Sequence, residues 1–379
     1  MRLFLLTFFL IYAAINLYAF LKAQAALLFG FETGTCVAVF MSIMVFAPLI
    51  VHFLERTGLD FYARFMAYVG YLWLGLLFLF FSYSLAIDFY RILVFLTGLI
   101  VQKNQSRLTL SARYAFFLPL FFSFATACYG YFEARNIRTE KITIKTPRIP
   151  LEVGTLKIAQ ISDVHLGLIV REDRLRRILD IVKEAHPDIL VSTGDLVDGQ
   201  VCKLNGLTDL FREIQPKYGK FAITGNHEFY AGFDQARCFT EDAGFRLLRA
   251  EVVNISGIIN IAGVDDPAAK LDGLSKDISE KDLLSGRPGN RFTLFLKHRP
   301  VVNKEAAGLF DLQLSGHVHK GQIFPFSIIT GLYYPVQAGF ANVSNDSFLY
   351  VSRGAGTWGP PIRFLSPPEV AIIELVHGD

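Results

Sequence analysis

The sequence predicts an all-α membrane region followed by an α/β domain, and three observations indicate this division. Charged residues are scarce before about residue 132 and ordinary afterwards, although the whole chain is 52% hydrophobic with a mean hydropathy of +0.39. Several apolar segments in the first part are long enough to cross a bilayer. From residue 156 onward, short apolar segments alternate with helical or polar ones, a pattern typical of an α/β domain with a buried sheet.

Four N-terminal segments have the length and apolarity of membrane spans, namely residues 3–21, 35–54, 66–87 and 115–132. The first is followed by further apolar segments rather than by a cleavage site, so we expect an anchor and not a signal peptide. Residues 92–101 are apolar but too short for another crossing, which favours an extended helix or a re-entrant piece. Asp88 and Arg91 have helical spacing and are expected to form an interfacial ion pair, with an intramembrane site as the alternative.

Basic residues near the spans predict the orientation. With the N-terminus inside, the cytoplasmic side would hold eight of them, against five on the other side. The eight are Arg2, Arg56, Arg64, Arg135, Arg138, Lys141, Lys145 and Arg148, and the five are Lys22, Arg91, Lys103, Arg107 and Arg113. We therefore expect an integral membrane protein whose C-terminal domain is cytoplasmic.

Charge and cysteine content narrow the possible partners. The formal net charge of +3 gives no reason to expect a nucleic acid duplex as a partner. Four cysteines lie far apart and show no metal-ligand or disulfide spacing; they are Cys36, Cys128, Cys202 and Cys238. Nothing in the sequence indicates an oligomeric state.

Residues 133–155 are expected to form a basic linker and a first strand, because 141–145 alternates like a strand and prolines follow it. The folded domain is then expected over 156–379. Residues 171–186 have the apolar spacing of a helix. The strand candidates are 156–162, 188–193, 219–224, 258–264, 292–297, 311–315 and 370–376.

Polar side chains follow several of these strands. They are Asp163 and His165, then Asp195, then Asn226, His227 and Glu228, then His298, and finally His317 and His319. A single Asp-x-His pair or a lone histidine is a weak signal, but five of the eight histidines at successive strand ends are not explained as ordinary structural residues. Carboxylate and imidazole together suit a divalent metal. Two Asp, one Asn and four His can build two adjacent metal sites with a shared carboxylate, which is the chemistry of phosphoester hydrolysis.

Taken in order, these motifs resemble the signature of the calcineurin-like metallophosphoesterases over about residues 140–379. The resemblance implies a four-layer αββα sandwich, a dinuclear metal site at its loop edge, and metal-dependent phosphoric ester hydrolase activity. One metal would be held by Asp163, His165 and His319, and the second by Asn226, His298 and His317, with Asp195 bridging. His227 would polarise the substrate or protonate the leaving group, supported by Glu228. Mn, Fe and Zn all suit such ligands, and we favour Mn.

The C-terminal segment 350–369 resembles bacterial membrane-linked members of this family and the animal transmembrane proteins with a metallophosphoesterase domain. A bacterial inner membrane is the location that this resemblance implies. Arg353 or Arg363 would bind a substrate phosphate or, alternatively, brace the Gly-rich loop against the sheet. Lys320 stands where the family usually has glycine, and the added cation would favour a further phosphate or an anionic head group.

Two further segments have alternative interpretations. Phe229, Tyr230 and Phe233 would line the site as an apolar wall for an acyl chain or pack under the loop. Residues 263–267 would line the cleft or cap a turn, and we favour the turn.

The expected function is hydrolysis of a phosphodiester, pyrophosphate or phosphomonoester by a membrane-bound enzyme. A lipid- or glycolipid-linked substrate is preferred because the spans place the site close to a bilayer. Two alternatives stand beside it. One is a membrane-anchored phosphodiesterase that acts on soluble nucleotides, and the other is a non-catalytic membrane sensor or scaffold.

Overall fold

The computed structural model describes residues 2–102, 108–199, 204, 206–276, 278–344 and 346–378. Lys103, Arg107 and Cys202, which entered the arguments on orientation and cysteine spacing, lie outside the described residues. The chain forms two compact units. The first comprises Met1–Phe132 with Gly359–Ile362, and the second comprises Glu133–Trp358 with Arg363–Asp379.

The first unit is helical. In the described residues, three helices are long and apolar enough to cross a membrane: α1 (Arg2–Leu27), α4 (Asp60–Val101) and α5 (Ala112–Arg135). The expected span 35–54 is instead two helices, α2 (Phe31–Val45) and α3 (Ala47–Arg56), which meet at an angle of 55° and count as a fourth span only if taken together. A proline in the first turn of α3 lacks a backbone N–H, which favours a new helix start there.

Of the two alternatives for residues 92–101, the extended helix is confirmed, because α4 continues without a break through residues 88–101 to a length of 42 residues. Asp88 lies inside it and pairs with Lys22 of α1, while the Tyr18 hydroxyl donates to Asp88 Oδ2 at 2.7 Å. Arg91 lies farther away, at 3.8 Å from Asp88 Oδ1. The expected ion pair between Asp88 and Arg91 is therefore present, and Lys22 of another helix is a second and closer basic partner of Asp88.

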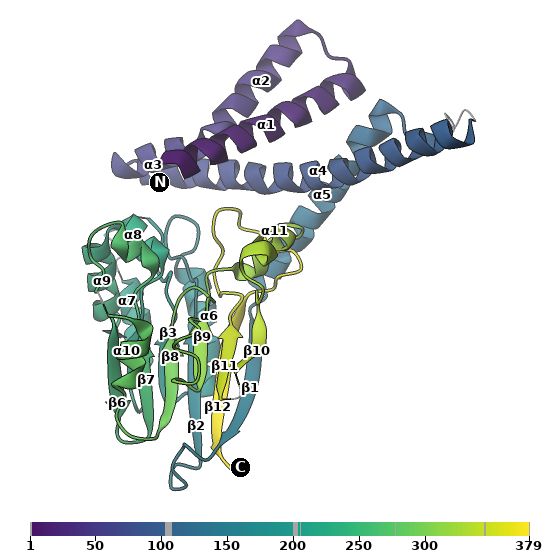
Figure 1. Cartoon of the computed structure of the whole chain (residues 1–379). Helices are drawn as coiled ribbons and strands as arrows, with labels where there is room; N and C mark the ends of the chain where they lie inside the picture. The colour runs from purple at the N-terminus through teal and green to yellow at the C-terminus, as the bar shows by residue number, and fades with distance from the viewer. Residues whose placement is uncertain are drawn as a thin grey trace. The chain divides into compact units, whose positions relative to one another are not determined.

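The second unit contains two six-stranded mixed sheets (Figure 1). The first has the order β1-β12-β2-β3-β4-β5, with β1 (Arg138–Thr146), β12 (Glu369–His377), β2 (Thr155–Ile161), β3 (Ile189–Ser192), β4 (Lys220–Ala222) and β5 (Arg246–Leu247). The second has the order β10-β11-β9-β8-β7-β6, with β10 (Gly339–Ser344), β11 (Ser347–Val351), β9 (Leu312–Ser315), β8 (Phe292–Leu296), β7 (Ile259–Gly263) and β6 (Glu251–Ile255).

The second unit begins at Glu133 and not at residue 156 as expected. The first strand expected within residues 133–155 is β1, and all nine of its residues pair in parallel with β12 and complete the edge of the first sheet. The seven expected strands correspond to β2, β3, β4, β7, β8, β9 and β12. The expectation missed β5, β6, β10 and β11, because β5 has only two residues and β10 has no fully buried residue.

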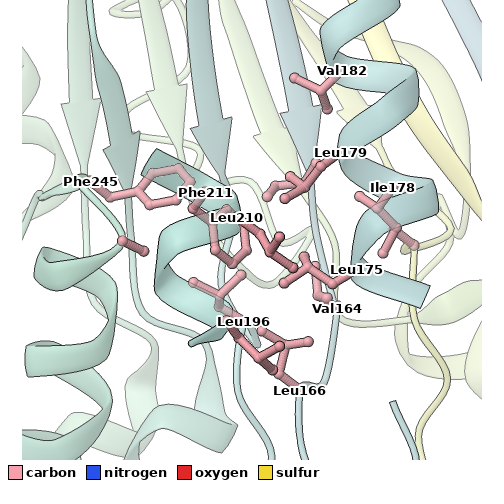
Figure 2. Close-up of a cluster of buried hydrophobic side chains, with 14 of the residues drawn as sticks. Val164, Leu166, Leu175, Ile178, Leu179, Val182, Leu196, Leu210, Phe211 and Phe245 are labelled. Atoms are coloured by element: carbon pink, nitrogen blue, oxygen red, sulfur yellow. The ribbon is translucent and has the colours of Figure 1, made fainter. Parts of the chain in front are cut away.

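Apolar side chains on alternating positions form the layers of this unit. Between the sheets, Ile158, Val191, Leu294 and Leu314 belong to one buried cluster. On the other face of the first sheet, Ile161 and Leu190 pack against Leu175 and Leu179 of α6 (Glu172–Ala185), as Figure 2 shows for the helix side of this cluster. Phe295 and Phe310 pack with Leu284 of α10 (Glu280–Ser285) on the outer face of the second sheet. The order helix, sheet, sheet, helix is the sandwich that the motif series implied.

Candidate metal centre

The polar motifs lie at one edge of the sandwich because of the strand directions. Strands β2, β3 and β4 are parallel neighbours, and so are β8 and β9. The carboxyl ends of the strands within each set therefore lie at the same edge. The residues that follow these strand ends are Asp163 and His165, Asp195, Asn226 and His227, His298, and His317 and His319. The sequence motifs are thus brought together by parallel pairing.

The site loops have an unusual backbone. Asp163, His165, Asp195, His317 and His319 all have positive φ, between 49° and 72°. This left-handed region is uncommon for residues other than glycine, and such conformations cluster at functional sites. The loops also hold one another. The Asp163 N–H donates to the Gly194 carbonyl and the His165 N–H to the Asp195 carbonyl, both at 3.0 Å.

Two glycines lie against the two aspartates. A Cβ atom on Gly225 would lie 2.2 Å from Asp195 Oδ1, and one on Gly316 would lie 2.1 Å from Asp163 Oδ2. A nearby backbone N–H fixes each carboxylate. His227, two residues after Gly225, donates its backbone N–H to Asp195 Oδ1, and His317, directly after Gly316, donates its backbone N–H to Asp163 Oδ1, both at 2.8 Å. Only glycine permits this close backbone approach.

The ligand atoms form overlapping groups whose members lie within 4.8 Å of one another. Asp163, His165 and His319 form one group, in which His165 Nε2 lies 3.0 Å from His319 Nε2. His319 Nε2 lies 3.5 Å from Asp163 Oδ1. This group offers one carboxylate and two imidazole nitrogens to a common point.

A second group consists of Asp195, His298 and His317. His298 Nε2 lies 3.1 Å from Asp195 Oδ2 and 3.2 Å from His317 Nδ1. Asp195 Oδ2 also lies 3.8 Å from His165 Nε2 in the first group. Asp195 is therefore positioned between the two groups.

The donor set fits divalent cations. Nitrogens of neighbouring imidazoles lie at contact distance, an arrangement that a shared cation explains better than a protein hydrogen bond. Among the described residues, Asn226 Oδ1 is buried yet accepts no hydrogen bond. A buried polar atom without a partner is costly, so Asn226 Oδ1 fits as a further ligand for the group around Asp195.

For His165, His317 and Asp195, the surrounding protein groups favour the protonation states in which these residues bind metal. Burial lowers the pKa of His165 to about 4 and that of His317 to about 3, so both rings are neutral near pH 7 and have a free lone pair. Burial disfavours the charged form of Asp195, but the neighbouring His298 and His227 overcome this effect and hold its pKa well below the usual range. Metal ligands of these types bind in these states.

His227 has a carboxylate partner that the sequence analysis did not identify. Its Nδ1 lies 3.0 Å from Asp198 Oδ1. Burial lowers the pKa of His227, but the charges of Asp195 and Asp198 outweigh burial and raise it to about 9. The spacing Gly-Asp-x-x-Asp over 194–198 was the available sequence signal, since Asp198 lies three residues after a ligand in the same loop.

The hydrogen bonds of Glu228 go to backbone groups rather than to the His227 ring. Its carboxylate accepts hydrogen bonds from four backbone N–H groups, those of Asp195 at 3.0 Å, Leu196 at 2.7 Å, Val197 at 3.3 Å and Gly225 at 2.6 Å. Glu228 therefore ties the loop after β3 to the loop after β4. The carboxylate in direct contact with His227 is that of Asp198.

The arginines expected at the substrate have structural contacts. Arg363 is fully buried, and it donates from Nη2 to the Gly356 carbonyl at 2.6 Å and lies 2.9 Å from His319 Nδ1. Arg353 is bound by Glu140 and by Glu369, at 2.5 Å from the latter. These contacts support the alternative interpretation, in which both arginines brace the Gly-rich loop. Lys320 is exposed beside the site.

The other two segments also have structural contacts. Phe229 and Phe233 are buried, stack at 5.4 Å, and pack with Ala268 and Ala269, so they lie under the loop. Tyr230 is 61% exposed, with its ring 5.5 Å from that of His227. In segment 263–267, Asp266 caps the turn by accepting from the Ala268 N–H at 2.8 Å.

The fold and the donor set together define a metal-dependent phosphoester hydrolase. Residues 156–321 match the calcineurin-like phosphoesterase family. An uncharacterized metallophosphoesterase of Aquifex aeolicus is 40% identical over 258 residues, which cover 68% of this chain and 98% of that protein. The chain belongs to the calcineurin-like phosphoesterase family.

Two further relatives also carry the family's name. An uncharacterized metallophosphoesterase of Campylobacter jejuni is 30% identical over 300 residues, which cover 78% of each chain. The matched part of this chain is longer than the second unit, so the similarity extends into the N-terminal helices. A transmembrane protein with metallophosphoesterase domain from Danio rerio is 30% identical over 273 residues, covering 68% of this chain and 62% of that protein.

Proposed function

We propose that this chain is a membrane-anchored phosphoesterase with two divalent metal ions, acting on a phosphodiester, pyrophosphate or phosphomonoester that is carried by a lipid or glycolipid. The observation that carries the proposal is the position of Asp195 between two groups of ligand atoms. One cation would be held by Asp163, His165 and His319 and the other by Asn226, His298 and His317, with Asp195 shared. Manganese is the metal that we propose, and iron and zinc suit the same donors.

Two cations in such a site supply positive charge for phosphoryl oxygens and lower the pKa of a water molecule. The protein supplies the proton for the leaving group. Because Asp198 Oδ1 accepts from Nδ1–H of His227, the second ring proton lies on Nε2. With a pKa of about 9, His227 is an imidazolium at neutral pH and can donate that Nε2 proton to a departing alkoxide.

The lipid-linked substrate is supported by the presence in the same chain of helices long and apolar enough to cross a membrane. The site borders aromatic rings that suit the apolar part of a substrate. Trp358 and Tyr230 lie 5.9 Å and 5.5 Å from the His227 ring, and Tyr334 lies 5.6 Å from the His317 ring. Lys320 would add a cation for an anionic head group. We place the catalytic unit on the cytoplasmic face of a bacterial inner membrane, as the distribution of basic residues predicts.

The side of the membrane depends on whether α2 and α3 together cross it. With four crossings, both ends of the chain lie on the same side, and with three they lie on opposite sides. Reporter fusions after His52 and after the C-terminus distinguish these cases. A C-terminal reporter that is active only outside the cytoplasm would overturn the proposed orientation.

The first test of the function is hydrolysis of bis(p-nitrophenyl) phosphate by the purified full chain with Mn²⁺, with metal content measured in parallel. We expect turnover in the parent chain. Asp195→Ala is expected to lose both metal and activity, and His227→Ala to lose activity while it retains metal. Absence of turnover with two metals bound would refute general phosphodiesterase activity and favour a binding protein.

The substrate class is tested on the same preparation in lipid vesicles. Phosphoesters embedded in the vesicles and soluble cyclic and linear nucleotides are compared at equal concentration. Faster cleavage of the embedded substrates supports the proposal. Hydrolysis of the nucleotides alone would identify the alternative, a membrane-anchored nucleotide phosphodiesterase.

A further inference from the structure

Helix α11 (Phe326–Tyr333) exposes the side chains that a soluble helix normally buries. Ile328, Ile329, Leu332 and Tyr333 are 62%, 49%, 79% and 77% exposed, and none of the eight residues of α11 is buried. At 3.6 residues per turn, these four side chains fall within about 140° of the helix circumference. A water-soluble domain places such an apolar stripe against its core. In α11 the stripe faces outward.

The opposite face of α11 holds the helix in this orientation. Thr330 Oγ1 donates to Gln337 Oε1 at 2.6 Å, and a Cβ on Gly331 would lie 2.7 Å from Gln337 Nε2. A Cβ on Gly321 would lie 2.4 Å from the backbone nitrogen of Ser327. Small and polar residues thus pack on the domain, so rotating α11 to bury its apolar face would break these contacts.

The apolar surface continues around the start of α11. Phe324 is 41% exposed, and Trp358 is 53% exposed. Two backbone hydrogen bonds hold Trp358 next to this segment. Its backbone N–H donates to Gln322 Oε1 at 2.9 Å, and its backbone carbonyl accepts from Gln322 Nε2 at 2.8 Å. Residues 312–345 contain no Asp or Glu, and Lys320 is their single Lys or Arg. An anionic bilayer surface would meet no repelling carboxylate from this segment.

Helix α11 lies at the metal edge of the domain. It follows His319 closely in the chain, and Tyr334, which follows its last residue, has its ring 5.6 Å from that of His317. Figure 1 shows α11 at one end of the strands and the turn between β1 and β2 at the other.

The chain enters the second unit at the same metal edge. Arg138, the first residue of β1, pairs with Glu369, and Ala371 of the same β12 pairs with Gln160 near the end of β2. The start of β1 therefore lies at the edge where Asp163 and His165 follow β2. Helix α5, which is long and apolar enough to span, ends at Arg135. The two residues between α5 and β1 reach about 7 Å, so β1 begins a short distance along the chain after the end of α5.

We propose that the apolar face of α11, formed by Ile328, Ile329, Leu332 and Tyr333, inserts into the interfacial layer of the lipid bilayer. Eight helical residues extend about 12 Å, too short to cross a bilayer and suited to lie along its surface. Tyrosine and tryptophan favour this interface. The insertion holds the opening of the metal site at the membrane surface. It rests on the proposed membrane anchoring and is independent of the substrate.

The test places a single tryptophan on α11 of the full chain. Trp73 and Trp358 are the chain's only tryptophans, so Trp73→Phe and Trp358→Phe together provide a background without them. Leu332→Trp is then introduced, and the protein is reconstituted in phosphatidylcholine vesicles with or without brominated acyl chains. We expect blue-shifted emission and, with brominated lipid, a loss of about half of the fluorescence or more.

The matched control is Leu151→Trp in the same background. Leu151 is 71% exposed, close to the 79% of Leu332, and it lies in the turn between β1 and β2 at the opposite end of the strands. We expect emission typical of a water-exposed tryptophan and no quenching by brominated lipid. A second control carries only Trp358→Phe, so that Trp73 in α4 reports on the anchoring helices.

Each outcome separates the two proposals. Quenching at position 332 and at Trp73 but not at position 151 supports insertion of α11. Quenching of Trp73 with water-exposed emission at position 332 overturns the α11 proposal and leaves the anchoring intact. Blue-shifted but unquenched emission at position 332 also overturns it, because a protein surface, such as a second copy of the chain, would then cover α11. An unquenched Trp73 would instead contradict the anchoring itself.

Discussion

Replacing Glu228 by glutamine distinguishes a positioning role of this residue from a catalytic one. The Glu228 carboxylate accepts four backbone N–H hydrogen bonds, at 2.6 to 3.3 Å, from the loops that carry Asp195 and Asn226. A glutamine amide has one acceptor oxygen, so its NH₂ group would face two N–H donors. Two hydrogen bonds to a charged acceptor are lost, and each contributes about 1.5–3 kcal/mol. Burial raises the pKa of Glu228 to about 7, so the comparison is made well above that pH, where the carboxylate is charged. There we expect Glu228→Gln to lower the free energy of unfolding of the second unit by about 3–6 kcal/mol.

Urea unfolding of the full chain in detergent measures this change. In a Trp73→Phe background, Trp358 is the remaining tryptophan and reports on the second unit. Glu213→Gln is the matched control, since Glu213 is exposed and pairs with Lys183 on the surface, and we expect no change in its unfolding midpoint. Metal affinity should fall in Glu228→Gln because the loops of Asp195 and Asn226 are no longer held together. A variant as stable and as metal-loaded as the parent, yet inactive, would refute the positioning role.

Three further predictions concern the same site. Asp198→Asn removes a carboxylate that raises the pKa of His227. The parent should lose activity as pH rises through about 9, and in the variant this loss should begin at lower pH. An unchanged kcat–pH profile would exclude the proposed pair of His227 and Asp198. Arg363→Met removes the two donors that Arg363 gives to the Gly356 carbonyl and leaves only the 3.4 Å hydrogen bond from Arg174 Nη2. It should lower the free energy of unfolding by about 2–4 kcal/mol, whereas Lys320→Met should leave the unfolding midpoint unchanged. Removal of metal by a chelator should lower the melting temperature, because buried like charges then face one another, and Mn²⁺ should restore it; identical melting curves would argue against resident cations.

Much of the site was predictable from the sequence because metal ligation requires particular residue types in a fixed order. The candidate ligand positions, the α/β character and seven strands followed from short apolar runs, several of which end in Asp, Asn or His. The two-residue strand β5 and the partly exposed strand β10 could not be predicted, because their residues carry no apolar alternation and pair only where neighbouring strands offer an edge.

The roles of second-layer residues required the tertiary structure. Glu228 and Asp198 are both acidic residues near ligands, and only the folded loops show that the first binds backbone amides and the second binds His227. Arg353 and Arg363 looked equally suited to a phosphate or to a bracing role, and burial among carbonyls and carboxylates favours the second.

By itself, the sequence determined the division into apolar helices and an α/β domain, the family resemblance and the candidate ligands, because these depend on composition, periodicity and local motifs. Only the tertiary structure decided which side chains meet across the sheet edge and which face of α11 points outward. The meeting of the ligand side chains depends on contacts between residues far apart in the chain, such as His319 with His165 across 154 positions. The orientation of α11 depends on where the neighbouring segment folds back, as in the hydrogen bond from Thr330 to Gln337.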